Sequence, residues 1–355
     1  MSEPMNRPKW KEVEYTKAQI INAGKTIRHG NSTIDELTNA TKIIDNWRAA
    51  HAFPMVTIYS NLRRMCESNK KVLVAERLKR LDSIICKLKR EQHMNLWTMQ
   101  DLGGCRVIVP NISDVYKYFE QFHKSRIRHI LKRTKDYIIE PKSSGYRSFH
   151  AVYEYHSDRK DTYNRNMLIE IQFRTHLQHI WATAVETMGL LMNTSIKSGL
   201  GSEEVRRFFV LVSALIAKME GQPLPPGVVD DTERIICEIR ELDAKHSFLN
   251  LLDGMRVAVD KHSDIAIKKN YAYYILELDY MAKRLHIIAF KAGEIERANE
   301  LYNIMETDRK EQTIDVVLVR VSSFKSLKKA YPNYFSDIGE FCKIVKMHMI
   351  QDTKL

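Results

Sequence analysis

The chain has 355 residues, 44% of them hydrophobic and 28% charged, and carries a formal net charge of +12. This length suffices for one large or two ordinary domains with buried cores. The clustered basic surplus favours a polyanionic partner over a surface that only keeps the protein soluble.

The five cysteines lie far apart without a CxxC pair, which argues against structural zinc or a disulfide framework and fits a reducing cytosol. The first residues, MSEPMNRPKWKEVEY, are too charged for a signal peptide. The longest apolar stretch, FFVLVSALIA from Phe208, is about half of what a bilayer crossing needs. We therefore expect a cytoplasmic protein that makes no membrane contact.

The first two-thirds of the chain divides into three stretches. Residues 10–98 read as mostly helical and polar, with Thr33 as a cap and Glu36 closing a capping box. Residues 99–175 alternate β-rich runs, clearest in CRVIV and LIEIQF, with one helix over SDVYKYFEQF that begins at a Ser cap. From His176 to about Asp264 the chain reads as helical again, broken at the loop GQPLPPGVV.

A second, smaller unit begins near Asn270, with the predicted order β-β-α-β-α. Its helix is indicated by the apolar stripe Ile295, Ala298, Tyr302 and Met305. We predict three parts: an N-terminal helical region over 1–75, a catalytic domain with a helical extension over 76–268, and a C-terminal domain over 269–355. With no GxGxxG and no GxxxxGK[ST], a Rossmann or P-loop nucleotide fold is unfavoured.

Two acids stand where a sheet could carry chemistry. Alternation along LIEIQF places Glu170, Gln172 and Arg174 on one face of a strand, and Asp101 precedes the strand CRVIV where a loop meets the sheet. Such a polar face either meets solvent or forms a site, and the strand alone does not decide between them. One or two carboxylates, with phosphate oxygens and waters, are the usual ligands of magnesium.

Two further motifs accompany these acids. RLKRLDSIICKLKR has the pattern R-x-K-x-x-x-S-I-x-x-K, and KDYIIEPKSSGYRSFHA combines lysines, aromatic residues and a glycine-tyrosine turn. By composition alone the first is a basic amphipathic stretch, more often a solvated face than a site. The order of the motifs from about Glu76 to Glu186 resembles the synthetase domain of the RelA/SpoT nucleotide pyrophosphokinases.

The resemblance implies an α/β (α+β) fold with a mixed sheet flanked by helices, and pyrophosphoryl transfer from ATP with Mg²⁺. It implies that Asp101 and Glu170 hold the metal and that Glu170 is the base toward the acceptor hydroxyl. Tyr146 would stack on the acceptor base. Alternatively, Tyr146 is a packed tyrosine of a turn, and His150 is a core histidine whose hydrogen bonds are satisfied within the protein. By matched position, the resemblance implies that ATP is bound by Arg77, Lys79, Lys87, Lys135 and Lys142. It also implies that the wall of the site is completed by Gln172, Arg174 and His150.

The family includes enzymes that make (p)ppGpp from GDP or GTP and toxic relatives that modify the 3′ end of tRNA. The segment KSRIRHILKRTKD suits an extended phosphate backbone, although a charged edge strand that prevents aggregation is the alternative. LQHIWATAVETMG also resembles the toxic, phage-defence-associated members. We therefore expect tRNA as the acceptor, with a small alarmone synthetase as the nearest alternative and a catalytically dead RNA-binding or phage-sensing module as another. The predicted nucleic-acid contacts are Lys124, Arg126, Arg128, Lys132 and Arg133.

The C-terminal unit resembles the antitoxin portion of CapRel-type fused toxin–antitoxin proteins, a pseudo-zinc-finger-like α/β domain without metal ligands. Cys342 is the only cysteine after Cys237, and YPNY supplies the YxxY motif of those relatives with Tyr331 and Tyr334. The resemblance implies that these tyrosines, sharing one helical face, block the nucleotide site until a trigger, a phage capsid protein in those relatives, displaces them. Alternatively they pack the final helix onto its own domain.

Overall fold

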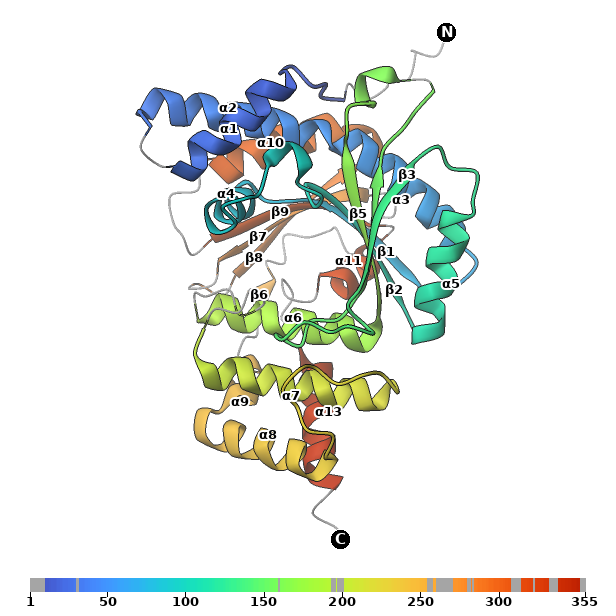
Figure 1. The fold of residues 1–355 in the computed structure, drawn as a ribbon, viewed down its shortest axis with the longest axis vertical. Coiled ribbons are helices and arrows are strands. Elements are labelled where there is room, and N and C mark those ends of the chain that lie inside the picture. Colours follow the sequence, from blue (N-terminus) through green and yellow to red (C-terminus); the bar gives the residue numbers. More distant parts are fainter. Residues whose placement is uncertain are drawn as a thin grey trace.

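The computed structural model describes residues 10–29, 32–158, 160–192, 196, 201–253, 258–259, 271–279, 282, 284–307, 314–321, 323–331 and 338–351. Within these residues a nine-stranded sheet has the order β3-β4-β5-β2-β1-β9-β7-β8-β6 (Figure 1). Its strands are β1 (Leu73–Leu78), β2 (Gly103–Val109), β3 (Ile130–Asp136), β4 (Phe149–Glu154), β5 (Leu168–Thr175), β6 (Ala258–Val259), β7 (Tyr271–Asp279), β8 (Arg284–Lys291) and β9 (Ile314–Arg320).

The helices of the described residues lie on both sides of the sheet and beyond one end of it (Figure 1). They are α1 (Lys17–His29), α2 (Ile34–Ala50), α3 (Ala52–Cys66), α4 (Leu81–Arg90), α5 (Ile112–His123), α6 (His176–Leu191), α7 (Glu203–Met219), α8 (Thr232–His246), α9 (Phe248–Asp253), α10 (Ile295–Thr307), α11 (Phe324–Ala330) and α13 (Gly339–Gln351). Short 3₁₀ turns include Leu96–Thr98 and Asp161–Tyr163. No helix in the described part of the chain is long and apolar enough to cross a membrane.

The sheet is mixed, as predicted. β2 and β5 run parallel, whereas β1–β2, β4–β5 and β3–β4 are antiparallel. The predicted alternation along β5 is confirmed, because Ile169, Ile171 and Phe173 are fully buried against α3 and α5. The opposite face of β5 is therefore left for its polar side chains.

The C-terminal strands continue the same sheet through one short contact. β9 pairs with β1 over only Glu76↔Arg320 and Arg77↔Val319. α10 packs on the face of β7 and β9 that carries Tyr273 and Leu318. α11 packs on the opposite face, where Tyr274, Val317 and Val319 meet Ala75 of β1. The predicted order β-β-α-β-α is confirmed by β7, β8, α10, β9 and α11.

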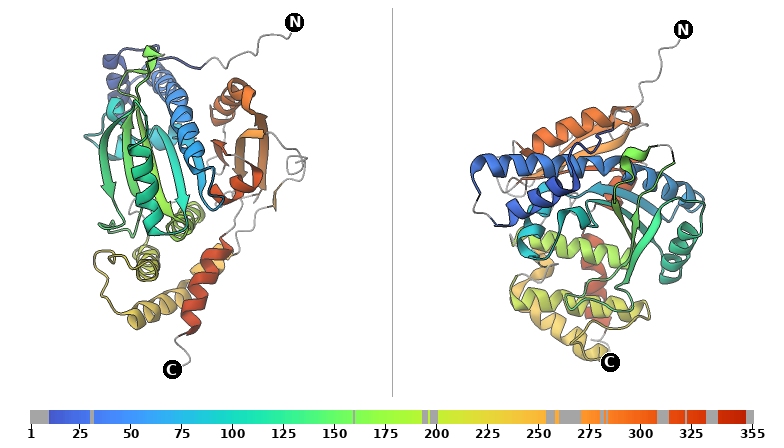
Figure 2. Two further views of the ribbon diagram at one scale, coloured as in Figure 1. Left: turned by 90° about the vertical axis from the view of Figure 1, so that its right-hand side faces the viewer. Right: turned by 45° about the horizontal axis from the view of Figure 1, so that its top comes forward.

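The last helix belongs with the helical extension rather than with the C-terminal strands. Phe341, Cys342 and Val345 of α13 are buried in the cluster formed by α6, α7, α8 and α9. Figure 2 shows α13 running away from the strands and alongside α8. The chain thus leaves this cluster after α9 and re-enters it at α13, while the domain boundary at residue 269 stays a prediction.

One predicted helix cap is confirmed and another was wrong. Thr33 and Glu36 form the expected capping box at α2. The N-cap of α5 is Asn111, whose side chain accepts from the N–H of Asp114, instead of the predicted serine. The prediction that residues 10–98 are mostly helical is confirmed by α1, α2, α3 and α4. It did not include β1, which is a strand because β2 and β9 supply hydrogen bonds on both of its sides.

Gly145 gives a test of how tightly the KSSGY loop is held. Its φ of +82° is left-handed, and an added Cβ would lie 2.9 Å from Ser213 Cβ and 3.1 Å from Trp181. We expect Gly145→Ala to lower the free energy of unfolding by about 2–4 kcal/mol, combining backbone strain with overpacking. Gly227→Ala is the matched control, because its φ is +78° with nothing within 4 Å of the added atom. Equal losses in urea denaturation of the two variants would contradict the packing argument.

Candidate active site

The strand register gathers the predicted residues into two rows across one face of the sheet. Arg77 pairs with Gly104, and Gly104 pairs with Glu170. The adjacent row contains Arg106, Gln172, His150 and Lys135 from β2, β5, β4 and β3. Residues paired directly across strands project to the same face. An added Cβ on Gly104 would have no heavy atom closer than 3.8 Å, so this glycine leaves open space between Arg77 and Glu170.

Asp101 lies between two lysines. Lys79 Nζ is 2.7 Å from Oδ2 and Lys87 Nζ is 3.0 Å from Oδ1. Lys79 follows β1, and its backbone N–H donates to the carbonyl of Leu102 at 2.8 Å, while Lys87 comes from α4. Burial by itself would raise the pKa of Asp101, but the two ammonium groups outweigh it and hold that pKa well below its ordinary value.

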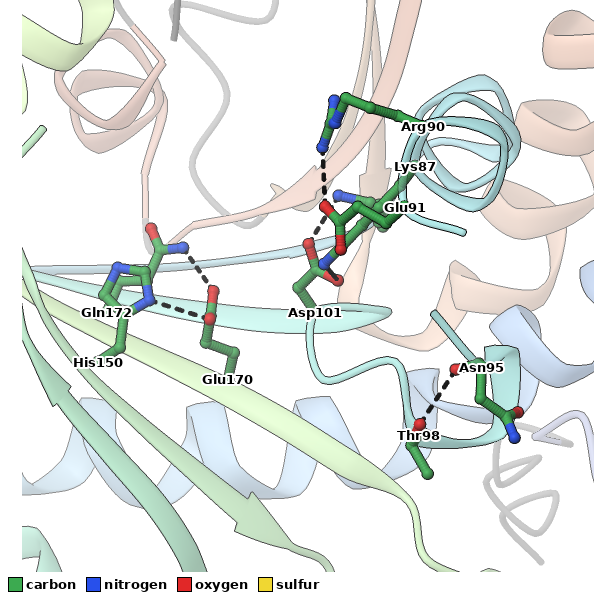
Figure 3. A network of polar contacts seen from close by, with 10 residues as sticks. Lys87, Arg90, Glu91, Asn95, Thr98, Asp101, His150, Glu170 and Gln172 are labelled. Atoms are coloured by element: carbon green, nitrogen blue, oxygen red, sulfur yellow. Dashed lines mark hydrogen bonds and ion pairs between the residues drawn. The ribbon is translucent and has the colours of Figure 1, made fainter. Parts of the chain in front are cut away.

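Glu170 accepts hydrogen bonds from two side chains, one on each carboxylate oxygen. His150 Nδ1 donates to Oε1 at 3.0 Å, and Gln172 Nε2 donates to Oε2 at 2.7 Å (Figure 3). Burial would raise the pKa of Glu170, yet the interaction with His150 outweighs it and the pKa is lowered. The charge of Asp101 opposes this lowering, so the two carboxylates interact electrostatically. They lie on the same side of the strands in Figure 3.

A hydrogen-bonded chain links the turn tyrosine to this acid. The hydroxyl of Tyr146 lies 2.9 Å from His150 Nε2, the nitrogen opposite the one that faces Glu170. Because the carboxylate only accepts, Nδ1 is the donor to Glu170, and Nε2 is hydrogen-bonded to the tyrosine hydroxyl. The side chain of Tyr146 is only 2% exposed, packed against α6 and α7, and burial raises its pKa to about 12. Tyr146 is therefore beside the acids, as expected, but a base could stack on it only after its surroundings move.

Two predicted lysines, Lys135 and Lys142, form the outer edge of the site together with Tyr137, which was not predicted. Lys142 Nζ lies 4.5 Å from the ring centroid of Tyr137 and 5.4 Å from that of Tyr146. Lys135 Nζ lies 5.7 Å from the Tyr137 ring, whose edge meets His150. Both lysines are exposed, so the two predicted phosphate-binding cations lie at the mouth of the site.

A group of buried cations forms the inner end of the site. Arg174 is fully enclosed and lies 2.5 Å from His179 Nδ1. Burial lowers the pKa of Arg174 well below its ordinary value, and repulsion by Arg106 adds to this. Among the described residues, the Nε–H groups of Arg106 and Arg174 lack a hydrogen-bond partner. Buried donors without partners are uncommon, and this pair suits an anionic ligand.

Arg106 and His179 were missed because only tertiary packing gives them a role. Both reach the end of α11: Arg106 Nη1 donates to the carbonyl of Ala330 at 3.3 Å, and His179 Nε2 donates to that of Lys329 at 2.9 Å. The alternation of CRVIV could have indicated Arg106, since it points to the same face as Gly104.

Tyr331 occupies the space in front of these cations. Its hydroxyl donates to the backbone carbonyl of Glu76 at 2.9 Å, and the guanidinium of Arg106 lies 6.0 Å from its ring centroid. The side chain is buried. It follows the last residue of α11, so the expectation that it lies within a helix was wrong. Tyr334 lies outside the described residues.

The predicted nucleic-acid segment lies along the edge strand β3 and the loop before it. Lys124, Arg128 and Lys132 form ion pairs with Glu120, Asp158 and Glu154 at 2.7, 3.1 and 3.0 Å. Arg126 and Arg133 belong to the same stretch. Since several of its cations already face acids, the segment is less strongly positive than its sequence suggests.

Asp101 and Glu170 are the carboxylates of the site that could bind magnesium. The described residues contain no group of three or more His, Cys, Asp or Glu side chains that could hold a metal ion. Asp101 and Glu170 nevertheless supply two carboxylates within electrostatic range, which suits Mg²⁺ when phosphate oxygens and waters complete its shell. These residues fit a metal that arrives with a polyphosphate rather than a permanently bound one.

Comparisons with known proteins point to the same part of the chain. Residues 76–188 match the family model described as a region found in RelA / SpoT proteins. GTP pyrophosphokinase YjbM of Bacillus subtilis is 34% identical over 113 residues, which covers 31% of this chain and 52% of the relative. GTP pyrophosphokinase YwaC of the same organism is 28% identical over 155 residues, covering 41% and 70%.

A solved structure is also similar. The crystal structure of small alarmone synthetase 1 from Bacillus subtilis bound to its product pppGpp has a TM-score of 0.41 and 26% identity, over 49% of this chain and 89% of that one. The present chain spans about half the length of YjbM, and the family match leaves the N-terminal helices and the C-terminal unit outside it.

The Asp101 ion pairs predict a specific pH dependence of stability. The pKa of Asp101 is depressed in the folded chain, so its pairs stabilise the fold above the ordinary value of 3.8 and lose that effect as pH falls below it. We expect Asp101→Asn to cost about 2 kcal/mol at pH 7, with a smaller difference from wild type below about pH 4. Urea denaturation between pH 3 and 7 measures it, with the exposed Asp35→Asn as control. A difference that stays constant with pH would contradict the assignment.

Proposed function

We propose that residues 76–188, a RelA/SpoT-type synthetase region, transfer pyrophosphate from ATP to a ribose hydroxyl of an acceptor. The observation that supports this most is that the carboxylates of Asp101 and Glu170 lie within electrostatic range of each other. Lys79, Lys87 and Arg106 border them. Phosphoryl-type transfers depend mainly on positioning and on charge stabilisation, and this face supplies acids and cations for both.

In the proposed reaction the acceptor oxygen attacks the β-phosphorus of ATP. Glu170 takes the proton of the hydroxyl, the bond between the β-phosphorus and the α,β-bridging oxygen breaks, and AMP leaves. His150 holds the carboxylate in place through Nδ1. Lys79 and Lys87 turn from Asp101 to the phosphates, and Arg106 and Arg174 provide the donors that lack protein partners. Mg²⁺, held by Asp101 and Glu170, would supply charge neutralisation on the phosphates.

The acceptor we place first is GDP or GTP. The relatives YjbM and YwaC are both named GTP pyrophosphokinases, and the family match over residues 76–188 includes the residues that form the site. This is the acceptor that the sequence interpretation ranked second. The polar groups that would meet a nucleotide here are those at the mouth of the site, Lys135, Lys142 and Tyr137.

The 3′ end of tRNA is the second candidate. It is favoured by the basic segment from Lys124 to Lys135, part of which forms an edge strand beside the site through the pairing of Lys135 with His150. Its exposed ion pairs are individually weak, so a phosphate backbone could compete for Lys124, Arg128 and Lys132. In that case the protein would act as a toxin that stops translation in anti-phage defence.

The described form is proposed to be the inhibited one. Arg106 donates to the carbonyl of Ala330 and lies over the ring of Tyr331, and His179 donates to the carbonyl of Lys329. Tyr146 is buried. ATP could reach Arg106 only after α11 moves away. A trigger acts by binding the open form more tightly than the closed one, and a phage capsid protein is the trigger that the CapRel resemblance suggests.

Incubation with γ-labelled ATP and either GDP, GTP or deacylated tRNA tests the reaction and its acceptor. We expect label in the guanine nucleotide, and Glu170→Gln should reduce transfer by at least about 100-fold, as for loss of a general base. Glu238→Gln is the matched control, since this acid pairs with Arg207 on α7 away from the site. Label in tRNA alone would reverse the order of the acceptors, and no label in any acceptor from an uninhibited variant would reject the function.

Inhibition by Tyr331 is tested with a pair of variants. Tyr331→Ala removes the ring over Arg106 and the hydrogen bond to Glu76, so ATP-dependent transfer should rise at least about tenfold. Tyr331→Phe keeps the ring and should give an intermediate rate. A Tyr331→Ala variant that is folded but no more active than wild type would contradict inhibition by this residue.

A further inference from the structure

A second contact between distant parts of the chain lies outside the candidate active site. Arg48 of α2 is 2% exposed and points at one side of α10. Its Nη1 donates to Glu306 Oε2 at 2.5 Å, and its Nη2 donates to Asn303 Oδ1 at 3.2 Å. The guanidinium also lies 5.4 Å from the ring centroid of Tyr302. The N-terminal helices thus hold the C-terminal unit through a buried arginine.

The other oxygen of the same carboxylate contacts the proposed ATP-binding helix. Glu306 Oε1 accepts from the backbone N–H of Leu81 at 2.9 Å, in the first turn of α4. At this end of a helix the N–H groups lack intrahelical partners and favour a negative charge. Further along, α4 carries Lys87, which holds Asp101. One carboxylate of the C-terminal unit therefore joins α2 to the helix that positions a catalytic-site lysine.

The neighbouring residue extends the contact. Arg80, the residue before α4, forms an ion pair with Asp315 of β9, which is buried. Both acids, Glu306 and Asp315, come from the C-terminal unit, and both basic partners come from residues preceding Lys87. The side chain of Glu306 is 6% exposed, so separation of the two parts would break charge pairs that water does not screen in the closed form.

We propose that Arg48 and Glu306 form a lock that keeps the C-terminal unit closed over the active site, and that the N-terminal helical region is thereby part of the inhibitory apparatus. The regulatory meaning of the lock rests on the function proposed above. The lock acts at a different place from Tyr331: it holds α10 on the opposite face of the sheet from α11. The two contacts stabilise the closed form from opposite faces of the sheet, so loss of either one shifts the population toward the open form.

The test compares Glu306→Gln with Glu300→Gln in the full-length protein. Glu300 lies on the same helix and is exposed, so the chemical change is matched and only the lock differs. The Glu306→Gln substitution retains the shape of the side chain and an acceptor for the N–H of Leu81. It removes the one carboxylate charge by which the C-terminal unit faces Arg48, while Asp45 of α2 remains paired with the same guanidinium at 2.6 Å. Hydrogen exchange is measured over β1, β9 and α11, and transfer from labelled ATP is measured on the same samples.

We expect Glu306→Gln to speed hydrogen exchange in β1, β9 and α11 at least about tenfold, because the closed form loses a charge-assisted hydrogen bond. The amides of β7 and β8 should stay protected. Transfer should rise in parallel. Arg48→Met should produce the same exchange pattern, and the double variant should add little to either one. Exchange in Glu306→Gln equal to that in Glu300→Gln would overturn the lock.

The two proposals fail in different ways. If exchange accelerates as expected but neither Glu306→Gln nor Tyr331→Ala transfers label to any acceptor, the lock stands and the enzymatic function falls. If Tyr331→Ala is active but Glu306→Gln exchanges like its control, the function stands and the lock falls.

Discussion

The structure depends most on the placement of opposite charges on one face of a sheet that is otherwise built for burial. Asp101 keeps its negative charge only because Lys79 and Lys87 surround it, and Glu170 keeps its own through His150 and Gln172. In the low dielectric of a protein interior such charges are tolerated only when they are paired. In the proposed reaction, the same cations would leave these acids for the phosphates of ATP.

This constraint explains why the C-terminal unit attaches where it does. β1 has an open edge next to Arg77, and β9 completes it with two residue pairs. The end of α11 supplies two backbone carbonyls that accept hydrogen bonds from Arg106 and His179. Sheet extension, these carbonyl contacts and the Arg48–Glu306 pair thus satisfy polar groups at three places where the C-terminal unit meets the rest of the chain.

The sequence predicted β5 and its polar face, because apolar and polar residues alternate along LIEIQF and the apolar ones are buried. It did not predict β1, whose residues LVAERL gain strand structure only from partners that are distant along the chain. The sequence did not predict the site contacts of Arg106 and His179 for a related reason, since their hydrogen-bond acceptors lie 224 and 150 positions away along the chain. The buried state of Tyr146 depends on α6 and α7, which no local pattern describes.

The path of the chain around the C-terminal strands has a consequence for how sensitively the protein could respond. The strands are connected at one end to α9 and at the other to α13, and both helices are buried in the same cluster. In the proposed inhibition, the C-terminal unit would therefore be present at a fixed, high effective concentration near the candidate site, whatever the amount of protein in the cell. A free partner that opens the site would have to outcompete this neighbour, so the response threshold would be set by the partner's abundance and affinity and not by dilution of the protein itself.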